Sequence, residues 1–113
     1  MAHAYRQVII SATSKKEAES LSALLLKKRL IAGSLIIHGP SQYWWQRKIV
    51  KKTYYNIQAF TVSSKKKTII AQVKRYHSDR APIIAFVQID GNTEFKKWID
   101  ESVHSQTSNV ILR

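Results

Sequence analysis

His77 and Asp79 are the side chains of this sequence best suited to bind a metal ion. Imidazole and carboxylate both ligate copper and zinc, and the two residues stand two positions apart. So few ligands hold such an ion poorly, and no spacing rule makes this pair a signature. His77 also has a structural interpretation, because a histidine at a helix end meets the helix dipole and backbone carbonyls. His3, His38 and His104 are further candidate ligands.

Three large rings stand in a row at Tyr43, Trp44 and Trp45, followed by the cations Arg47 and Lys48. In a strand, Tyr43 and Trp45 share one face and Trp44 takes the other. Such rings can line a ligand cleft or stack on bases, and Lys48 can bind an anion there. The alternative is that the rings pack in the core or in a subunit interface, beside a solvated turn.

The sequence lacks the motifs of common catalytic chemistry. It contains no cysteine, which excludes disulfides, thiolate metal sites and cysteine nucleophiles. It also has no glycine-rich phosphate loop, no nucleophile elbow and no His-Glu-x-x-His helix. A paired-carboxylate site would have to be assembled by the fold from its 7 Asp and Glu residues, and nothing in the sequence points to one. We therefore expect a protein that is not an enzyme; a hydrolase built in a cleft between subunits is the least supported alternative.

The length of 113 residues fits one domain, positions 1–113. No run of about 18 apolar residues occurs, so we expect no membrane span. The first residues show no signal-peptide pattern, and the lack of cysteine fits a reducing compartment. The cytoplasm is the expected location.

The chain carries 19 Lys and Arg against 7 Asp and Glu, a formal net charge of +12. The excess is spread along the chain in clusters of at most three, at positions 27–29, 51–52, 65–67 and 74–75. A field of this sign attracts polyanions without sequence preference. The alternative is a solvated surface with no partner.

Hydrophobic patterns predict the elements that must position these residues. Strands are expected at about residues 8–12, 30–38, 53–62 and 82–89, and helices at about 14–28, 63–77 and 93–102. Ser14 and Glu17 have the spacing of a capping box at the start of the first helix. A turn is expected at residues 39–41, a hairpin tip at Arg47 and Lys48, and a last short strand at residues 110–112.

The order β-α-β-β-α-β predicts a ferredoxin-like α+β fold, an antiparallel sheet with two helices on one face. The central hairpin, about residues 30–62, is longer than this fold requires. Overhanging strands must cover their edges, and pairing with another subunit is one solution. Gly33 within a strand indicates a bulge or the close approach of another backbone, and Pro82 is expected to start the last strand.

Four segments resemble motifs of the CutA divalent-cation tolerance family. Residues 28–32 (KRLIA) resemble its segment at a helix end, and residues 43–49 (YWWQRKI) resemble its Y-W-W-x-G-K-I hairpin. His77 with residues 82–84 (PII) resembles its H-P-Y-x-x-P-x-I segment, and residues 91–99 resemble its G-N-x-x-Y-L-x-W-L segment. The resemblance covers about residues 6 to 103. It implies a PII-like homotrimer and a role in tolerance of copper and other divalent cations, with Cu(II) as the candidate ligand.

The sequence departs from the family where a cation is expected to bind. The family cysteine falls at Gly33, and the acidic residue and glycine of the hairpin fall at Gln46 and Arg47. We therefore expect weakened metal affinity on a retained scaffold, with Gly33, Pro82 and Trp98 assigned to trimer packing. The alternatives are a basic module that binds polyanions and a PII-like signalling or scaffold protein.

Overall fold

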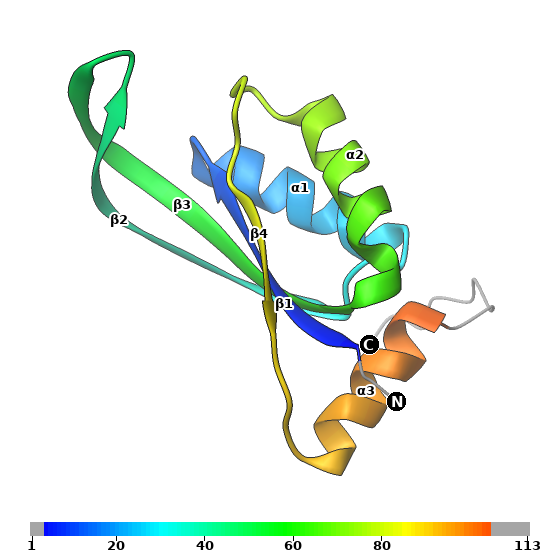
Figure 1. The fold of residues 1–113 in the computed structure, drawn as a ribbon. Coiled ribbons are helices and arrows are strands. Elements are labelled where there is room, and N and C mark those ends of the chain that lie inside the picture. The colour runs from blue at the N-terminus through cyan, green and yellow to red at the C-terminus, as the bar shows by residue number, and fades with distance from the viewer. Residues whose placement is uncertain (1–3, 105–113) are drawn as a thin grey trace.

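The computed structural model describes residues 4–104, which form a four-stranded sheet and three α-helices (Figure 1). The elements are β1 (Tyr5–Ala12), α1 (Lys15–Lys27), β2 (Gly33–Trp45), β3 (Lys48–Val62), a 3₁₀ turn η1 (Ser63–Lys65), α2 (Lys66–Tyr76), β4 (Ile84–Gln88) and α3 (Thr93–His104). The strand order is β2-β3-β1-β4, and every neighbouring pair is antiparallel. This confirms the predicted ferredoxin-like α+β fold. His3 and the strand predicted at residues 110–112 lie outside the described residues.

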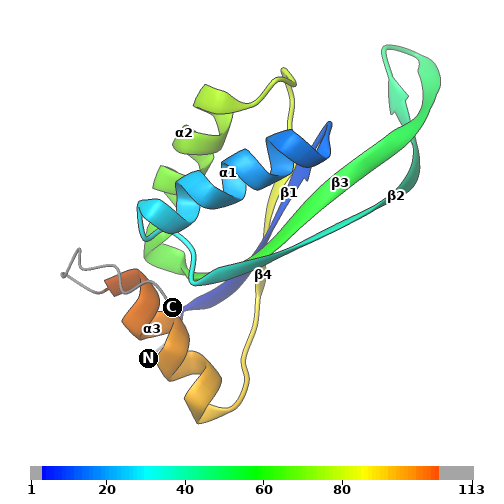
Figure 2. The same cartoon turned by 180° about the vertical axis from the view of Figure 1, so that it is seen from behind.

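Helices α1 and α2 cover one face of the sheet (Figures 1 and 2). Because side chains alternate along a strand, Val8 and Ile10 of β1 and Ile57 of β3 point to the same side. There they pack with Leu25 of α1 and Ile69 of α2 in a cluster from which water is excluded. This core holds the helical layer on the sheet. Within the described residues, no helix is both long and apolar enough to cross a membrane.

Helix α3 packs on the other side, at one end of the sheet. Its residues Ile99 and Val103 are buried against Phe60 and Val62 of β3, positions that point away from the α1–α2 core. The remainder of this face carries no described helix. Leu35 and Ile37 of β2 and Val87 of β4 are therefore exposed there.

Gly33 and Trp98 meet within the chain. A Cβ atom added at Gly33 would lie 2.9 Å from Cη2 of the Trp98 ring. The predicted close approach is therefore made by a side chain of α3, not by another backbone as we expected. Both residues therefore contribute to packing within the chain, and their assignment to trimer packing stays a prediction. Pro82 precedes β4, which begins at Ile84 and not at the proline.

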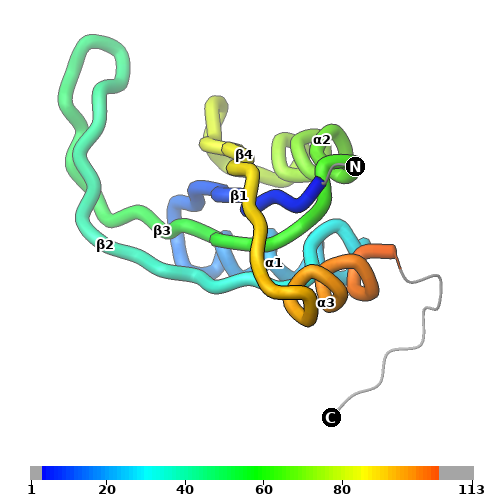
Figure 3. Tube along the Cα trace, turned by 60° about the horizontal axis from the view of Figure 1, so that its bottom comes forward, coloured from blue at the N-terminus to red at the C-terminus, as the bar shows by residue number. Residues whose placement is uncertain are grey.

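Strands β2 and β3 form one continuous hairpin that projects beyond the rest of the molecule (Figures 1 and 3). The turn predicted at residues 39–41 is wrong, because these residues pair with β3 inside the ladder. Pro40 is tolerated there because β2 is an edge strand with one side free of ladder bonds. The hairpin turns at Gln46 and Arg47, one residue earlier than predicted, with φ angles of 50° and 69°. Positive φ at both positions matches the twist of the strands but favours Asn-Gly.

Candidate functional site

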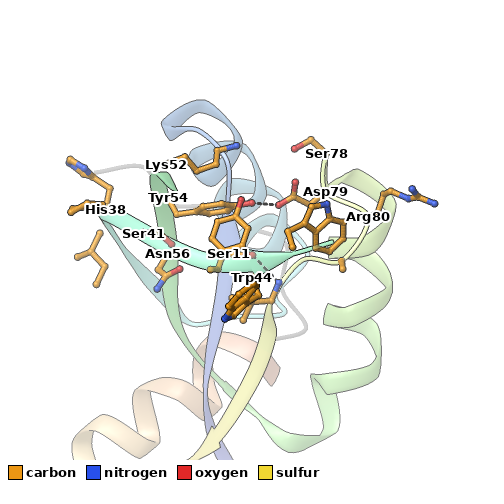
Figure 4. A pocket seen from close by; sticks show the side chains of 17 residues that line it. Ser11, His38, Ser41, Trp44, Lys52, Tyr54, Asn56, Ser78, Asp79 and Arg80 are labelled. Carbon is orange, nitrogen blue, oxygen red and sulfur yellow. Dashed lines mark hydrogen bonds between the residues drawn. The ribbon is translucent and has the colours of Figure 1, made fainter. Parts of the chain in front are cut away.

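A cleft of about 830 Å³ lies between the hairpin and residues 77–83, which we call the 77–83 loop (Figure 4). β2 supplies Tyr43, Trp44 and Trp45 to its lining, β3 supplies Lys52 and Tyr54, and the loop supplies Asp79 and Arg80. The fold therefore brings Asp79 together with the three rings that the sequence singled out. Lys48 lies at the tip of the hairpin and does not line the cleft.

His77 caps the C-terminal end of α2, and its side chain is 0% exposed. The backbone N–H of Asp79 donates to Nδ1 at 2.9 Å, so Nδ1 carries a lone pair and no proton. The other nitrogen, Nε2, then bears the proton and donates it to the carbonyl oxygen of Ser11. The imidazole is thus a neutral tautomer with both nitrogens engaged. This geometry supports the structural interpretation of His77.

Glu17 ties the same loop to the start of α1. Its Oε1 accepts hydrogen bonds from the backbone N–H and the hydroxyl of Thr13, at 2.9 and 3.0 Å. Its Oε2 accepts from the backbone N–H of Ser78 at 2.8 Å. Burial alone raises the pKa of Glu17, but the hydrogen bonds from Thr13 and Ser78 outweigh it and lower the pKa to about 2.

The capping box predicted for Ser14 and Glu17 is half confirmed. The Ser14 hydroxyl accepts from the backbone N–H of Glu17 at 3.1 Å, as a capping box requires. The Glu17 carboxylate, however, reaches Thr13 and not Ser14. Its second oxygen binds the 77–83 loop, a contact that no local sequence pattern signals.

Tyr54 fastens the loop to the hairpin. Its hydroxyl donates a hydrogen bond to the carboxylate of Asp79, drawn as a dashed line in Figure 4. Burial and this carboxylate both raise the pKa of Tyr54 above its ordinary value. Tyr43 packs edge-on against the Tyr54 ring, with centroids 5.6 Å apart. The sequence showed Tyr54 only as a strand residue, since nothing local connects it with a residue 25 positions away.

The described residues of one chain do not assemble a metal centre. Residues 4–104 contain no group of three His, Asp or Glu side chains able to hold an ion together. The rings of His38 and Tyr55 pack with their centroids 5.1 Å apart. Nε2 of His104, on α3, lies 3.8 Å from Oδ1 of Asp100. His77 and Asp79 are neighbours, but their polar atoms serve the fold. The predicted pair is thus adjacent in space without forming a site open to a cation.

These features define a ferredoxin-like α+β protein with an extended central hairpin and an aromatic cleft lined on one side by a tethered loop. Residues 7–102 match the family described as CutA1 divalent ion tolerance protein. The chain belongs to this family, as the four sequence motifs predicted.

Individual relatives agree with the family match. The chain is 37% identical over 97 residues to the divalent-cation tolerance protein CutA of Archaeoglobus fulgidus, covering 85% of this chain and 95% of that protein. The solved structure of the periplasmic divalent cation tolerance protein CutA from Archaeoglobus fulgidus superposes with a TM-score of 0.85 at 36% identity, covering 88% of this chain and 98% of that one. CutA1 from Oryza sativa, 21% identical, shares the fold with a TM-score of 0.86, covering 91% of this chain and 96% of that one.

Proposed function

We propose that this protein takes part in the tolerance of divalent cations as a non-catalytic member of the CutA family. The observation that carries the proposal is the family match over residues 7–102, which includes the hairpin, the 77–83 loop and most of α3. The tethered loop supports a non-catalytic role. The buried imidazole of His77 has both nitrogens engaged and is not free to act as a general base.

In this proposal the protein assembles as a homotrimer. Support comes from the uncovered face of the sheet, where Leu35 and Ile37 on β2, at one edge, and Val87 on β4, at the other edge, are exposed. Exposed apolar side chains of this kind are common in protein interfaces, and within the described sheet both edge strands, β2 and β4, leave ladder groups free for pairing. Light scattering tests the assembly. We expect about three times the chain mass of 13.0 kDa, whereas a monomer at micromolar concentration contradicts the trimer.

Copper binding is the finer part of the proposal, and the structure leads us to expect it to be weak. For His77 to ligate Cu(II) through Nδ1, the ion must displace the N–H of Asp79. Calorimetry with Cu(II) tests this on the native protein, on His77→Ala and on Asp79→Asn, with His104→Ala as the control on an exposed helix end. Binding lost in the first two variants and kept in the control supports the pair. Unchanged affinity in folded His77→Ala removes His77 from any role with the metal.

Two other functions are alternatives to cation tolerance. The aromatic cleft, with Trp44 and Trp45 in its lining, favours a PII-like signalling or scaffold role that depends on a small ligand. The net charge of +12 favours a basic module that binds polyanions. A thermal-shift screen of small anions tests the first, because only a ligand bound to the folded state raises the melting temperature.

The proposed location is the cytoplasm, on the absence of cysteine from the sequence. The solved relative from Archaeoglobus fulgidus is described as periplasmic. Cell fractionation of the untagged chain with compartment markers distinguishes the two, and recovery outside the cytoplasmic fraction contradicts the proposal.

A further inference from the structure

The net charge of this protein comes from one stretch of its sequence. Residues 20–78 contain 12 of the 19 Lys and Arg residues and none of the 7 Asp and Glu residues. The rest of the chain is balanced, with 7 residues of each sign. The charge is therefore not spread evenly, as its small clusters suggested, and the whole excess of +12 belongs to the segment from α1 to the end of α2.

The fold gathers half of this excess on the helical layer. The C-terminal end of α1 and the start of α2 lie side by side (Figures 1 and 2). Six cations of these two segments and of the rest of α2 form what we call the basic face: Lys27, Lys28, Lys65, Lys67, Lys74 and Arg75. Along α2 the face extends for about 15 Å, at 1.5 Å per residue. All six are exposed except Lys65, which is half-buried.

Stability of the fold does not explain the basic face. None of its six cations forms an ion pair with a carboxylate among residues 4–104. Lys27 and Lys28 complement the dipole at the end of α1, but Lys65 and Lys67 stand at the start of α2, where positive charge is unfavourable. That first turn contains no acidic residue. Unpaired like charges gathered at this cost indicate a surface whose counter-charge comes from a partner.

An exposed aromatic ring contacts Arg75, the last residue of the basic face. Tyr76 ends α2 and is 52% exposed, and the guanidinium of Arg75 lies over its ring, 5.3 Å from the centroid. A flat ring in contact with the last of several exposed cations suits unpaired nucleic acid, since phosphates meet the cations and a base stacks on the ring. Apart from Tyr76, Leu26 is the exposed large apolar residue on this layer, which leaves little to insert into a lipid surface.

We propose that the basic face binds the phosphate backbone of single-stranded nucleic acid, with Tyr76 as a stacking platform for one base. The inference rests on the polyanion alternative above and names its partner and its place. Helices α1 and α2 cover the face of the sheet opposite to Leu35 and Val87. Assembly through the uncovered face of the sheet therefore leaves the basic face in solvent, whatever the oligomeric state.

Fluorescence anisotropy with a labelled single strand of about 20 nucleotides tests the proposal. The test variant is Lys67→Gln/Lys74→Gln/Arg75→Gln, and the control is Arg47→Gln/Lys51→Gln/Lys97→Gln, which removes the same charge from the hairpin and α3. We expect the test variant to bind at least about tenfold more weakly at low salt and the control within about threefold. The slope of log affinity against log salt concentration should become less steep by up to about 2 in the test variant. Each phosphate that the protein no longer neutralises accounts for about 0.7 of this change.

Tyr76→Ala tests the stacking role, with Tyr76→Phe as the conservative control. We expect about fivefold or greater weakening in the first and little change in the second, because stacking needs the ring and not the hydroxyl. A duplex of equal length that binds as tightly as the single strand overturns the assignment to single strands. Equal weakening in the triple variant and its control overturns the basic face, and so does no binding by the native protein at low salt.

Vesicles containing phosphatidylserine provide the last arm. Vesicle binding that the triple variant loses, without any oligonucleotide binding, overturns a nucleic acid in favour of a membrane. Circular dichroism and light scattering of every variant show that fold and assembly are intact. A monomer that still binds the oligonucleotide through the basic face contradicts the trimer of the proposed function but leaves this inference standing.

Discussion

The two halves of the β2–β3 ladder share one register and have opposite surroundings. Near the core, Ile36 pairs with Ile57, whose side chain is fully buried. Toward the tip, Trp44 pairs with Ile49, and these are 71% and 56% exposed. Strand pairing therefore continues without regard to burial, because the turn and the backbone bonds set it. Burial is decided by which helices lie above the strands.

The difference also indicates where the molecule is incomplete as a single chain. A two-stranded hairpin is marginal in water unless it packs on something. The near half packs on α1 and α2, whereas the far half shows large rings to solvent. Its cover in the proposed function is a neighbouring subunit. Four pairs of variants test this contrast.

The largest expected effect comes from the same truncation in each half of β3. Ile57→Ala removes a fully buried side chain, and we expect a loss of about 2–4 kcal/mol in the free energy of unfolding. Ile49→Ala in the dissociated chain should change it by no more than about 0.5 kcal/mol. Urea unfolding followed by circular dichroism measures both. Equal losses would mean that the far half is buried after all, and the comparison would fail.

Gly33→Ala is expected to cost about 1–2 kcal/mol, because its new Cβ meets the Trp98 ring at 2.9 Å. The ring is partly exposed and can shift, which limits the penalty. Gly39→Ala, farther along the same strand, meets nothing within 4 Å and serves as the matched control. Urea unfolding again gives the values. Gly33→Ala/Trp98→Phe should recover part of the loss, and a double variant as unstable as Gly33→Ala would refute the contact.

The carboxylate of Glu17 makes the attachment of the 77–83 loop sensitive to acid. Its folded pKa of about 2 lies below the ordinary value of 4.5, so its contribution is present above about pH 4.5 and is lost as the pH falls toward 2. Glu17→Gln should cost about 1 kcal/mol at neutral pH, since the site is partly open to water. It should also flatten the acid dependence of stability between pH 4.5 and 2. Thermal unfolding across this range measures both, and Glu19→Gln, on an exposed position, should keep the native slope.

The smallest expected effect is a gain at the tip of the hairpin. Arg47 holds a φ of 69°, which costs a residue with a side chain but not glycine. Arg47→Gly should therefore stabilise the protein by about 0.5–1 kcal/mol. Lys48→Gly, one residue into β3, should instead lower stability by a similar amount. Chemical unfolding of the two variants checks the signs, and loss of stability in Arg47→Gly contradicts the strained turn.

Local patterns predicted much of the fold. The alternation of β3, the cap at Ser14 and the order of the elements follow from residues close together in the chain, and the structure confirms them. The prediction of a turn at residues 39–41 was wrong because it rested on a local pattern alone. Gly-Pro is a local turn signal, and the position of β2 at the sheet edge, which tolerates Pro40, is a tertiary property.

The candidate site followed from the sequence only in part. The rings at 43–45 and the residues of the 77–83 loop were recognised as separate motifs. Their meeting across the cleft, the bond from Tyr54 to Asp79 and the anchoring by Glu17 were not. Such contacts join residues 25 and 61 positions apart, and no periodicity records which distant partners a fold brings together.

The sequence alone is enough to assign this protein to a class: a ferredoxin-like α+β fold of the CutA family, without cysteine and with a net charge of +12. Motif order and hydrophobic alternation are enough for this assignment, because the spacing of apolar residues within each strand or helix identifies its buried face. Tertiary structure decided that His77 and Asp79 serve to hold a loop, and that Gly33 makes room for Trp98. It also decided that lysines from two helices share a face. The physical reason is that hydrogen-bond partners, free lone pairs and neighbouring charges depend on distances in space, which spacing along the chain does not specify.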